Sequence, residues 1–236
     1  MRYAAFLLCI AGPVAAQTGA PVFVLPAGCD AFVTVQSESC KVDHHFTCEA
    51  DPTGHQRRVS LDEQGPTYSG MIDAETQWLM SFQILSGHQE RLEPNPAEPA
   101  SLSDLIETGV DDYDFRTLSD EIGETRYVGQ DTLTGRQITI DGVTLDETTY
   151  DLKAYDASGE EVWSAKGNEF INRDWRMFLS GTGEVTTANG TFERANRPVE
   201  FIFPGESGFL SSHPKHGCGV AISSADIFKE KPHDNL

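Results

Sequence analysis

Residues 136–194 contain short apolar segments separated by tight-turn signals, and this pattern constrains the fold more than any other feature of the chain. Asp141 and Gly142 lie between two such segments, and this dipeptide tolerates the positive φ values of a two-residue type I′ loop. Pairing about the loop places Ile138 opposite Leu145, so that apolar side chains share one face of the hairpin. The segment therefore begins as an antiparallel pair.

Two later turn signals extend the same pattern. The turn at residues 156–159 is expected to place Leu152 opposite Trp163, and the next turn to place Thr187 opposite Phe192. Similar alternating segments precede residue 136. The sequence therefore predicts an all-β fold, an antiparallel meander that forms a strongly curved half-barrel or barrel with one short helix.

The first residues have the pattern of a secretory signal peptide. A positive end, an apolar run and a small-residue cleavage site occupy residues 1–16. We expect residues 17–228 to form a single antiparallel β domain and residues 229–236 to be a flexible tail. The protein is then exported through this N-terminal signal peptide to the periplasm.

One segment interrupts the strand pattern and is a possible break in the domain. Residues 93–109 begin with three prolines in seven residues, which cannot sustain a strand ladder. Serine and aspartate N-cap candidates follow, and Gly109 can end a helix, so we expect a short helix at residues 103–107.

Charge and hydropathy exclude two classes of partner. The formal net charge is −20 at pH 7, and a chain this acidic repels phosphate backbones, so we expect no nucleic-acid partner. No later apolar stretch approaches the ~20 residues that a membrane helix needs, so we expect a protein that does not span a membrane.

The first strand pair is expected around a turn near residue 40. Residues 30–36 and 41–47 alternate in polarity, and setting Gln36 opposite Lys41 places Val33 opposite His44. In this register an apolar face and a mainly polar face result.

Four cysteines follow the signal peptide, and an even number in an exported chain suggests two disulfides with three possible connectivities. The hairpin register places Cys29 opposite Cys48. Cys40 lies at the tip, ~26 Å along the strand from Cys48, which is beyond disulfide reach. We therefore predict the pairs Cys29–Cys48 and Cys40–Cys218.

Catalytic and metal-binding signals are weak. His213, His216 and Cys218 lie within six residues, but the spacing is not a recognised metal signature and Cys218 is assigned to a disulfide. Acidic pairs such as Asp111 and Asp112 are common in a chain with 37 acidic residues. We expect no metal and no cofactor, and a non-enzymatic protein; a hydrolase using an acidic pair or the His213–His216 loop is the alternative.

Aromatic side chains give the remaining functional signal. Several of them fall on strand faces that the alternation turns inward. Ordinary core packing explains such residues, and a curved sheet that presents part of this face to a hydrophobic ligand is the sharper interpretation. The candidate ligand-binding residues are Trp78, Phe82, Tyr150, Trp163 and Trp175.

An exported meander of about a dozen strands with one short helix resembles the unclosed β-barrel of periplasmic lipoprotein carriers of the LolA/LolB type, and related uncharacterised bacterial envelope proteins. The resemblance is architectural and covers residues 29–203. It implies a concave apolar face that can hold acyl chains, and hence a hydrophobic small molecule or lipid as partner in envelope maintenance. A structural or protein-interaction module with an envelope protein partner is the alternative.

Overall fold

The computed structural model describes residues 22–219, so the expectations for residues 1–16 and 229–236 lie outside the described residues. Within this range the chain forms one open antiparallel sheet, in the order β12-β11-β10-β9-β8-β7-β6-β5-β4-β3-β2-β1-β13. Each strand therefore pairs with its neighbours in sequence, except that β13 pairs with β1. The predicted all-β meander is confirmed. The elements are β1 (Cys29–Ser37), β2 (Lys41–Cys48), β3 (Gln56–Asp62), β4 (Gly65–Ile72), β5 (Trp78–Gln83), β6 (His88–Leu92), α1 (Leu102–Thr108), β7 (Val110–Ser119), β8 (Gly123–Ile140), β9 (Val143–Asp156), β10 (Glu161–Asn172), β11 (Met177–Thr187), β12 (Gly190–Ala195) and β13 (Pro198–Ile202).

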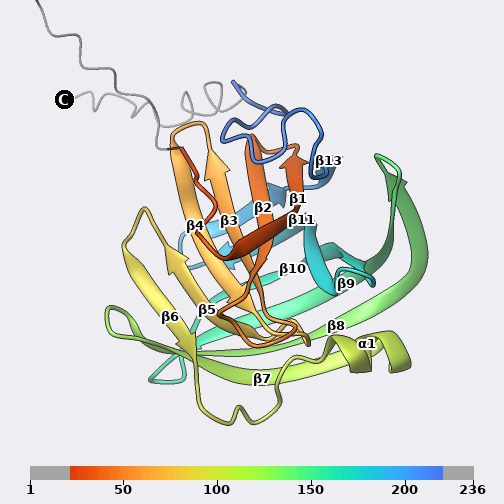
Figure 1. Ribbon diagram of the computed structural model, residues 1–236. Coiled ribbons are helices and arrows are strands. Elements are labelled where there is room, and N and C mark those ends of the chain that lie inside the picture. Colours follow the sequence, from red (N-terminus) through yellow and green to blue (C-terminus); the bar gives the residue numbers. More distant parts are fainter. Residues whose placement is uncertain (1–21, 220–236) are drawn as a thin grey trace, which may run out of the picture.

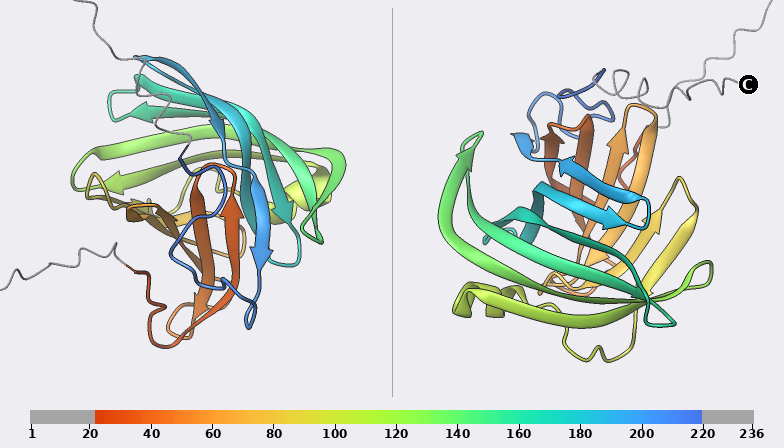
Figure 2. Two further views of the ribbon diagram at one scale, coloured as in Figure 1. Left: turned by 90° about the horizontal axis from the view of Figure 1, so that it is seen from above. Right: turned by 180° about the vertical axis from the view of Figure 1, so that it is seen from behind.

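The sheet is strongly curved. Figure 1 shows β1–β4 standing upright while β7–β9 run across the base, and Figure 2 shows from behind that β11 and β12 lie over the first strands. The two edge strands, β12 and β13, are consecutive in the chain and are joined through Asn196 and Arg197. The sheet thus curls until its edges approach each other at this corner without pairing.

Curling buries β10 on both faces. Phe170 packs in a core with Val33 of β1 and with residues of β9, β11 and β13. Ile171, the next residue, packs against Leu102 and Leu105 of α1. Adjacent residues of a strand point to opposite faces, so one end of β10 lies between two cores.

The proline-rich segment does not end the sheet. On its two sides, β6 pairs with β7 through Arg91 with Leu118 and Leu92 with Thr117. The predicted helix is present as α1, with Ser101 accepting a hydrogen bond from the Asp104 N–H as N-cap and Gly109 in the left-handed C-cap conformation. No helix within residues 22–219 has the length and apolar character needed to cross a membrane.

The hairpin registers agree with the sequence prediction near Gly142 and differ farther along. Ile138 lies opposite Leu145, as predicted. Leu152 lies opposite Ala165 instead of Trp163, because the loop and a bulge near Val162 together shift the register by two residues. A shift of two keeps every side chain on its predicted face.

The β11–β12 hairpin shows the same kind of difference. Thr187 lies opposite Gly190, and Phe192 lies opposite Val185 instead of Thr187. The turn therefore consists of Ala188 and Asn189, one residue earlier than the predicted turn. Again the shift is two residues, so the faces are unchanged.

The β1–β2 register changes within the hairpin. A bulge near Phe32 shifts the pairing by one residue, so Val33 lies opposite His45 and not His44 as predicted. A one-residue shift exchanges the faces. His44 consequently shares a face with Thr34, whose hydroxyl lies 3.0 Å from its Nδ1, and Val33 points into the core shared with Phe170.

Both predicted cysteine pairs are confirmed. The S–S distance is 2.00 Å for Cys29–Cys48, which joins directly opposite residues of β1 and β2. It is 2.16 Å for Cys40–Cys218. The second bond holds the segment after β13 against the β1–β2 turn, where the Cys40 N–H also donates to the His216 carbonyl at 2.8 Å.

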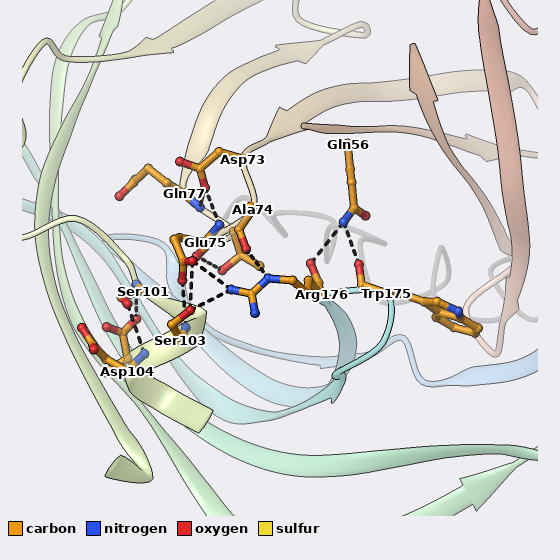
Figure 3. Close-up of polar contacts among 12 residues, drawn as sticks. Gln56, Asp73, Ala74, Glu75, Gln77, Ser101, Ser103, Asp104, Trp175 and Arg176 are labelled. Atoms are coloured by element: carbon orange, nitrogen blue, oxygen red, sulfur yellow. Dashed lines mark hydrogen bonds and ion pairs between the residues drawn. The ribbon is translucent and has the colours of Figure 1, made fainter. Parts of the chain in front are cut away.

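Arg176 ties together parts of the sheet that are far apart in strand order (Figure 3). Its Nε donates to the Ala74 carbonyl at 2.7 Å, and its Nη2 contacts Glu75 at 2.9 Å and the Ser103 hydroxyl at 3.0 Å. The side-chain amide of Gln56 donates to the carbonyl of Trp175, the residue before Arg176, at 2.6 Å. The β10–β11 turn, the β4–β5 loop and α1 are thereby held at one end of the curl.

We expect the Cys40–Cys218 bond to stabilise the fold more than Cys29–Cys48. The two bonds span 178 and 19 residues of sequence, and the chain-entropy model gives about 5 and about 3 kcal/mol for loops of these lengths. Urea unfolding of the serine double variants C40S/C218S and C29S/C48S measures both values. Equal or reversed losses in the free energy of unfolding would contradict this order.

Candidate functional site

An aromatic cluster lies on the concave face of the sheet. The ring centroid of Trp78 on β5 lies 5.4 Å from that of Tyr127 on β8, and Tyr127 lies 6.0 Å from Trp163 on β10. Strands are ~4.8 Å apart, so rings separated by intervening strands meet only on the side toward which the sheet curves. The aromatic cluster comprises Trp78, Tyr113, Phe115, Tyr127 and Trp163.

A bulge at Leu79 separates two of the predicted ligand-binding residues. Ile72 pairs with Trp78, but Met71 pairs with Met80, so the alternation breaks between them. Phe82 falls on the convex face as a result, whereas its neighbour Ser81 on the concave face donates to Glu90 at 3.2 Å. The predicted inward position of Phe82 is therefore wrong.

Trp175 is also placed apart from the aromatic cluster. It lies in the β10–β11 turn, with its ring 5.7 Å from Phe201 and 6.0 Å from Phe203. Tyr150, in contrast, packs beside the aromatic cluster on the concave face. The structure brings together three of the predicted residues: Trp78, Tyr150 and Trp163.

Polar side chains continue this face toward β12. Cross-strand partners run from Asp111 through Asp131 to Tyr150, and then through two glycines to Arg194. The glycines leave room for the tyrosine, since a Cβ atom at Gly183 would lie 2.6 Å from the Tyr150 hydroxyl. Glu169 shares the face of Gly167 two residues away. We call Asp111, Asp131, Tyr150, Glu169 and Arg194 the polar band.

Arg58 faces the polar band from the other side of the curl. It pairs with His45 in the β2–β3 ladder, and its guanidinium carbon lies 4.9 Å from the Tyr68 ring centroid. Its positive charge opposes the effect of burial on the pKa of Glu169, so the two side chains are close enough to interact. The concave face therefore carries both charge signs.

The carboxyl groups of the polar band have strongly raised pKa values. Burial raises the pKa of Asp131 to about 8, and the negative charges of Glu169 and Asp111 add to this. Burial raises the pKa of Glu169 to about 7, against the opposing charges of Arg58 and Arg194. Burial also raises the pKa of Asp111 to about 6, although the Ser101 N–H donates to it.

Asp131 and Glu169 have no hydrogen-bond or ion-pair partner among residues 22–219, yet both are only half-buried. Buried polar groups in proteins almost always have such partners. Asp131 and Glu169 both project from the concave face, so their exposed atoms face solvent on that side. These two carboxyl groups can therefore bind a group from outside the chain.

The two adjacent histidines of β2 do not add charge to this face. Burial lowers the pKa of His44 to about 4 and that of His45 to about 3, so both are neutral at pH 7. Asp43 beside them has a lowered pKa, because Lys41, Arg58 and a Ser60 hydrogen bond outweigh its burial.

The weaker sequence signals have other roles in the structure. Cys218 is bonded to Cys40, and His216 lies 3.4 Å from Glu200. Asp111 is buried whereas Asp112 is exposed, since they point to opposite faces of β7. The acidic pair that forms is the cross-strand pair Asp111 and Asp131.

Two depressions lie elsewhere on the surface. One, of about 470 Å³, lies beside β13, but its Asp141 and Glu206 carboxylates already accept backbone N–H groups. The other, of about 340 Å³, lies beside Arg136 and Arg173, which pair with Glu147 and Asp146. Neither offers an unpaired group of the kind found in the polar band.

Comparison of the chain with protein-family models, with curated proteins and with solved structures finds no match. The resemblance to lipoprotein carriers therefore gains no support from these comparisons, and the case for a function depends on the concave face itself.

Sequence reasoning did not identify Asp131, Glu169 or Arg58 as site residues. One signal was present, because Asp131 follows Tyr127 at an even spacing and so shares its face. Glu169 and Arg58 give no comparable signal, since only the curl of the sheet brings β3 opposite β10.

Replacing Asp131 by Asn should stabilise the protein at alkaline pH. The folded-state pKa lies above the unfolded value, so between about pH 4 and about pH 8 the folded state keeps a proton that the unfolded state has lost, and stability falls across this range. We expect D131N to exceed the wild type by about 2 kcal/mol at pH 8.5 and to match it near pH 4.

Urea unfolding at the two pH values measures this difference, and D151N, which removes an exposed carboxylate from the neighbouring strand, is the control. A D131N variant no more stable than the wild type at pH 8.5 would show that this carboxyl group is freely hydrated.

Proposed function

We propose that this protein is an exported, non-enzymatic binding protein that holds an amphipathic small molecule on its concave face. The apolar part of the ligand would lie on the aromatic cluster and its polar part against the polar band. One observation carries the proposal. Trp78 is 44% exposed although it packs against Phe115 and Tyr127, so an aromatic surface on the concave side stays open to solvent.

Export to the periplasm is part of the proposal. Residues 1–16 have the signal-peptide pattern, and the two disulfide pairs fit an oxidising compartment. Protein recovered from the periplasm of an expressing bacterium should begin at Gln17. An intact mass that includes residues 1–16 would contradict cleavage at this position.

Trp78 and Phe82 form a matched pair that tests the binding face. They lie on the same strand and are similarly exposed, at 44% and 39%, but point to opposite faces. The neutral fluorescent probe N-phenyl-1-naphthylamine should bind the wild type, and W78A should weaken its binding about tenfold by loss of ring contact. F82A should leave the dissociation constant unchanged.

Two outcomes would contradict the proposal. The first is no saturable probe binding by the delipidated wild-type protein. The second is an equal loss of binding in W78A and F82A, which would indicate general loosening of the fold and no concave-face site.

The raised pKa values of Asp131 and Glu169 also favour a second candidate, acid–base hydrolysis, because catalytic carboxyl groups often titrate near neutrality. Turnover of a chromogenic glycoside or ester that is lost in both D131N and E169Q would establish this alternative in place of simple binding.

A further inference from the structure

The concave face also indicates the charge of the ligand. We propose that the polar band binds the cationic head of an organic ligand between Asp131 and Glu169, while the apolar part of that ligand contacts the aromatic cluster. This inference rests on the proposed binding function and adds the chemical class of the ligand.

Several polar groups on this face have no partner within residues 22–219. Asp131 and Glu169 project from β8 and β10 on the same face, on either side of β9. Thr148 of β9 lies directly opposite Glu169, is 0% exposed, and its hydroxyl has no hydrogen-bond partner within residues 22–219. Three neighbouring strands therefore contribute oxygen atoms without a partner in residues 22–219, and an unpaired hydroxyl as fully buried as that of Thr148 is rare.

Acidic side chains outnumber basic ones on this face. Asp111, Asp131 and Glu169 place three acidic groups on this face. Arg58 is already engaged by the Tyr68 ring and by the charges of Asp43 and Glu169, and Arg194 is an exposed side chain on β12. A bound anion would meet three carboxyl groups, and a neutral ligand would leave Asp131 and Glu169 without an ion-pair partner, whereas a cation adds positive charge beside them.

An aromatic surface lies beside these carboxyl groups. Tyr150 is the cross-strand partner of Asp131, and Tyr113 lies within the electrostatic reach of Asp131 and Glu169. Ring faces attract organic cations, and carboxylates with aromatic rings are a common combination for ammonium groups. The net charge of −20 also attracts cations from solution.

A bare metal ion fits this arrangement less well. A metal requires ligand atoms that converge on one point. Among residues 22–219, one set of acidic, cysteine or histidine side chains has ligand atoms that converge in this way. It consists of Cys40, Glu63 and Cys218, and its two cysteines already form a disulfide. Asp131 and Glu169 are separated by a strand, which suits a larger organic head group.

Binding of a cation should strengthen as the pH rises through the range in which these groups ionise. The groups facing Asp131 and Glu169 are Asp111, Tyr113 and Tyr150 from β7 and β9, Arg58 from β3 and Arg194 from β12. Of these, the carboxyl groups gain negative charge between about pH 6 and pH 8, while arginine keeps its charge.

The test compares three probes that share a twelve-carbon chain and differ in head group: dodecyltrimethylammonium, dodecyl maltoside and dodecanoate. Isothermal titration calorimetry below the micelle concentrations at pH 8 should give tighter binding of the cation than of the other two by about tenfold or more. Its affinity should fall at least fivefold at pH 5.5.

The variant D131N/E169Q should weaken binding of dodecyltrimethylammonium at least tenfold and should weaken dodecyl maltoside binding by less than about threefold, because a neutral head group forms no ion pair with these side chains. D151N/E184Q is the matched control, because it also neutralises two acidic residues, on β9 and β11, that lie outside the polar band. This variant should bind dodecyltrimethylammonium as the wild type does. Circular dichroism melts confirm that each variant is folded.

The outcomes separate this inference from the proposed function. If all three probes bind equally and D131N/E169Q has no effect, the cation preference is wrong and apolar binding stands. If no probe and no N-phenyl-1-naphthylamine binds the folded wild type, the binding function itself fails and this inference fails with it.

Discussion

The curl of this sheet is held by contacts between strands that do not pair, and Arg176 makes several of them. The strand order brings the two edges together only where β12 and β13 are joined through Asn196 and Arg197. Arg176, which immediately precedes β11, contacts Ala74, Glu75 and Ser103 and so joins the β10–β11 turn to the β4–β5 loop and α1. Hydrogen bonds to a charged group are among the stronger polar contacts in proteins, and this one acts where the ladder provides no pairing.

The curl produces a face with two chemical halves. Rings from β5, β7, β8 and β10 meet in the aromatic cluster, and acidic side chains of β7, β8 and β10 lie beside them. Placing unpaired carboxyl groups such as Asp131 in this position destabilises the ionised folded state, as its raised pKa shows. Side chains that destabilise the folded state are common in binding and catalytic sites.

Much of the fold follows from local sequence signals, and the site follows from them only in part. Asp141 and Gly142 set the β8–β9 register, and alternation assigned the faces of Trp163 and Tyr150 correctly. The prediction failed for Phe82 because a one-residue bulge at Leu79 leaves no mark in the pattern of apolar residues. Arg58 lies opposite Glu169 only because the whole sheet curls, and no local sequence pattern predicts this curl.

The central claim is that the concave face holds carboxyl groups without a hydrogen-bond or ion-pair partner among residues 22–219. Carbon-13 NMR titration of the aspartate and glutamate carboxyl carbons in the ligand-free protein tests it most directly. The account predicts that Asp131 and Glu169 titrate close to pH 8 and pH 7, several units above exposed carboxyl groups. Titration of both groups near pH 4 would contradict it, because freely hydrated carboxylates would need no ligand to pair with them.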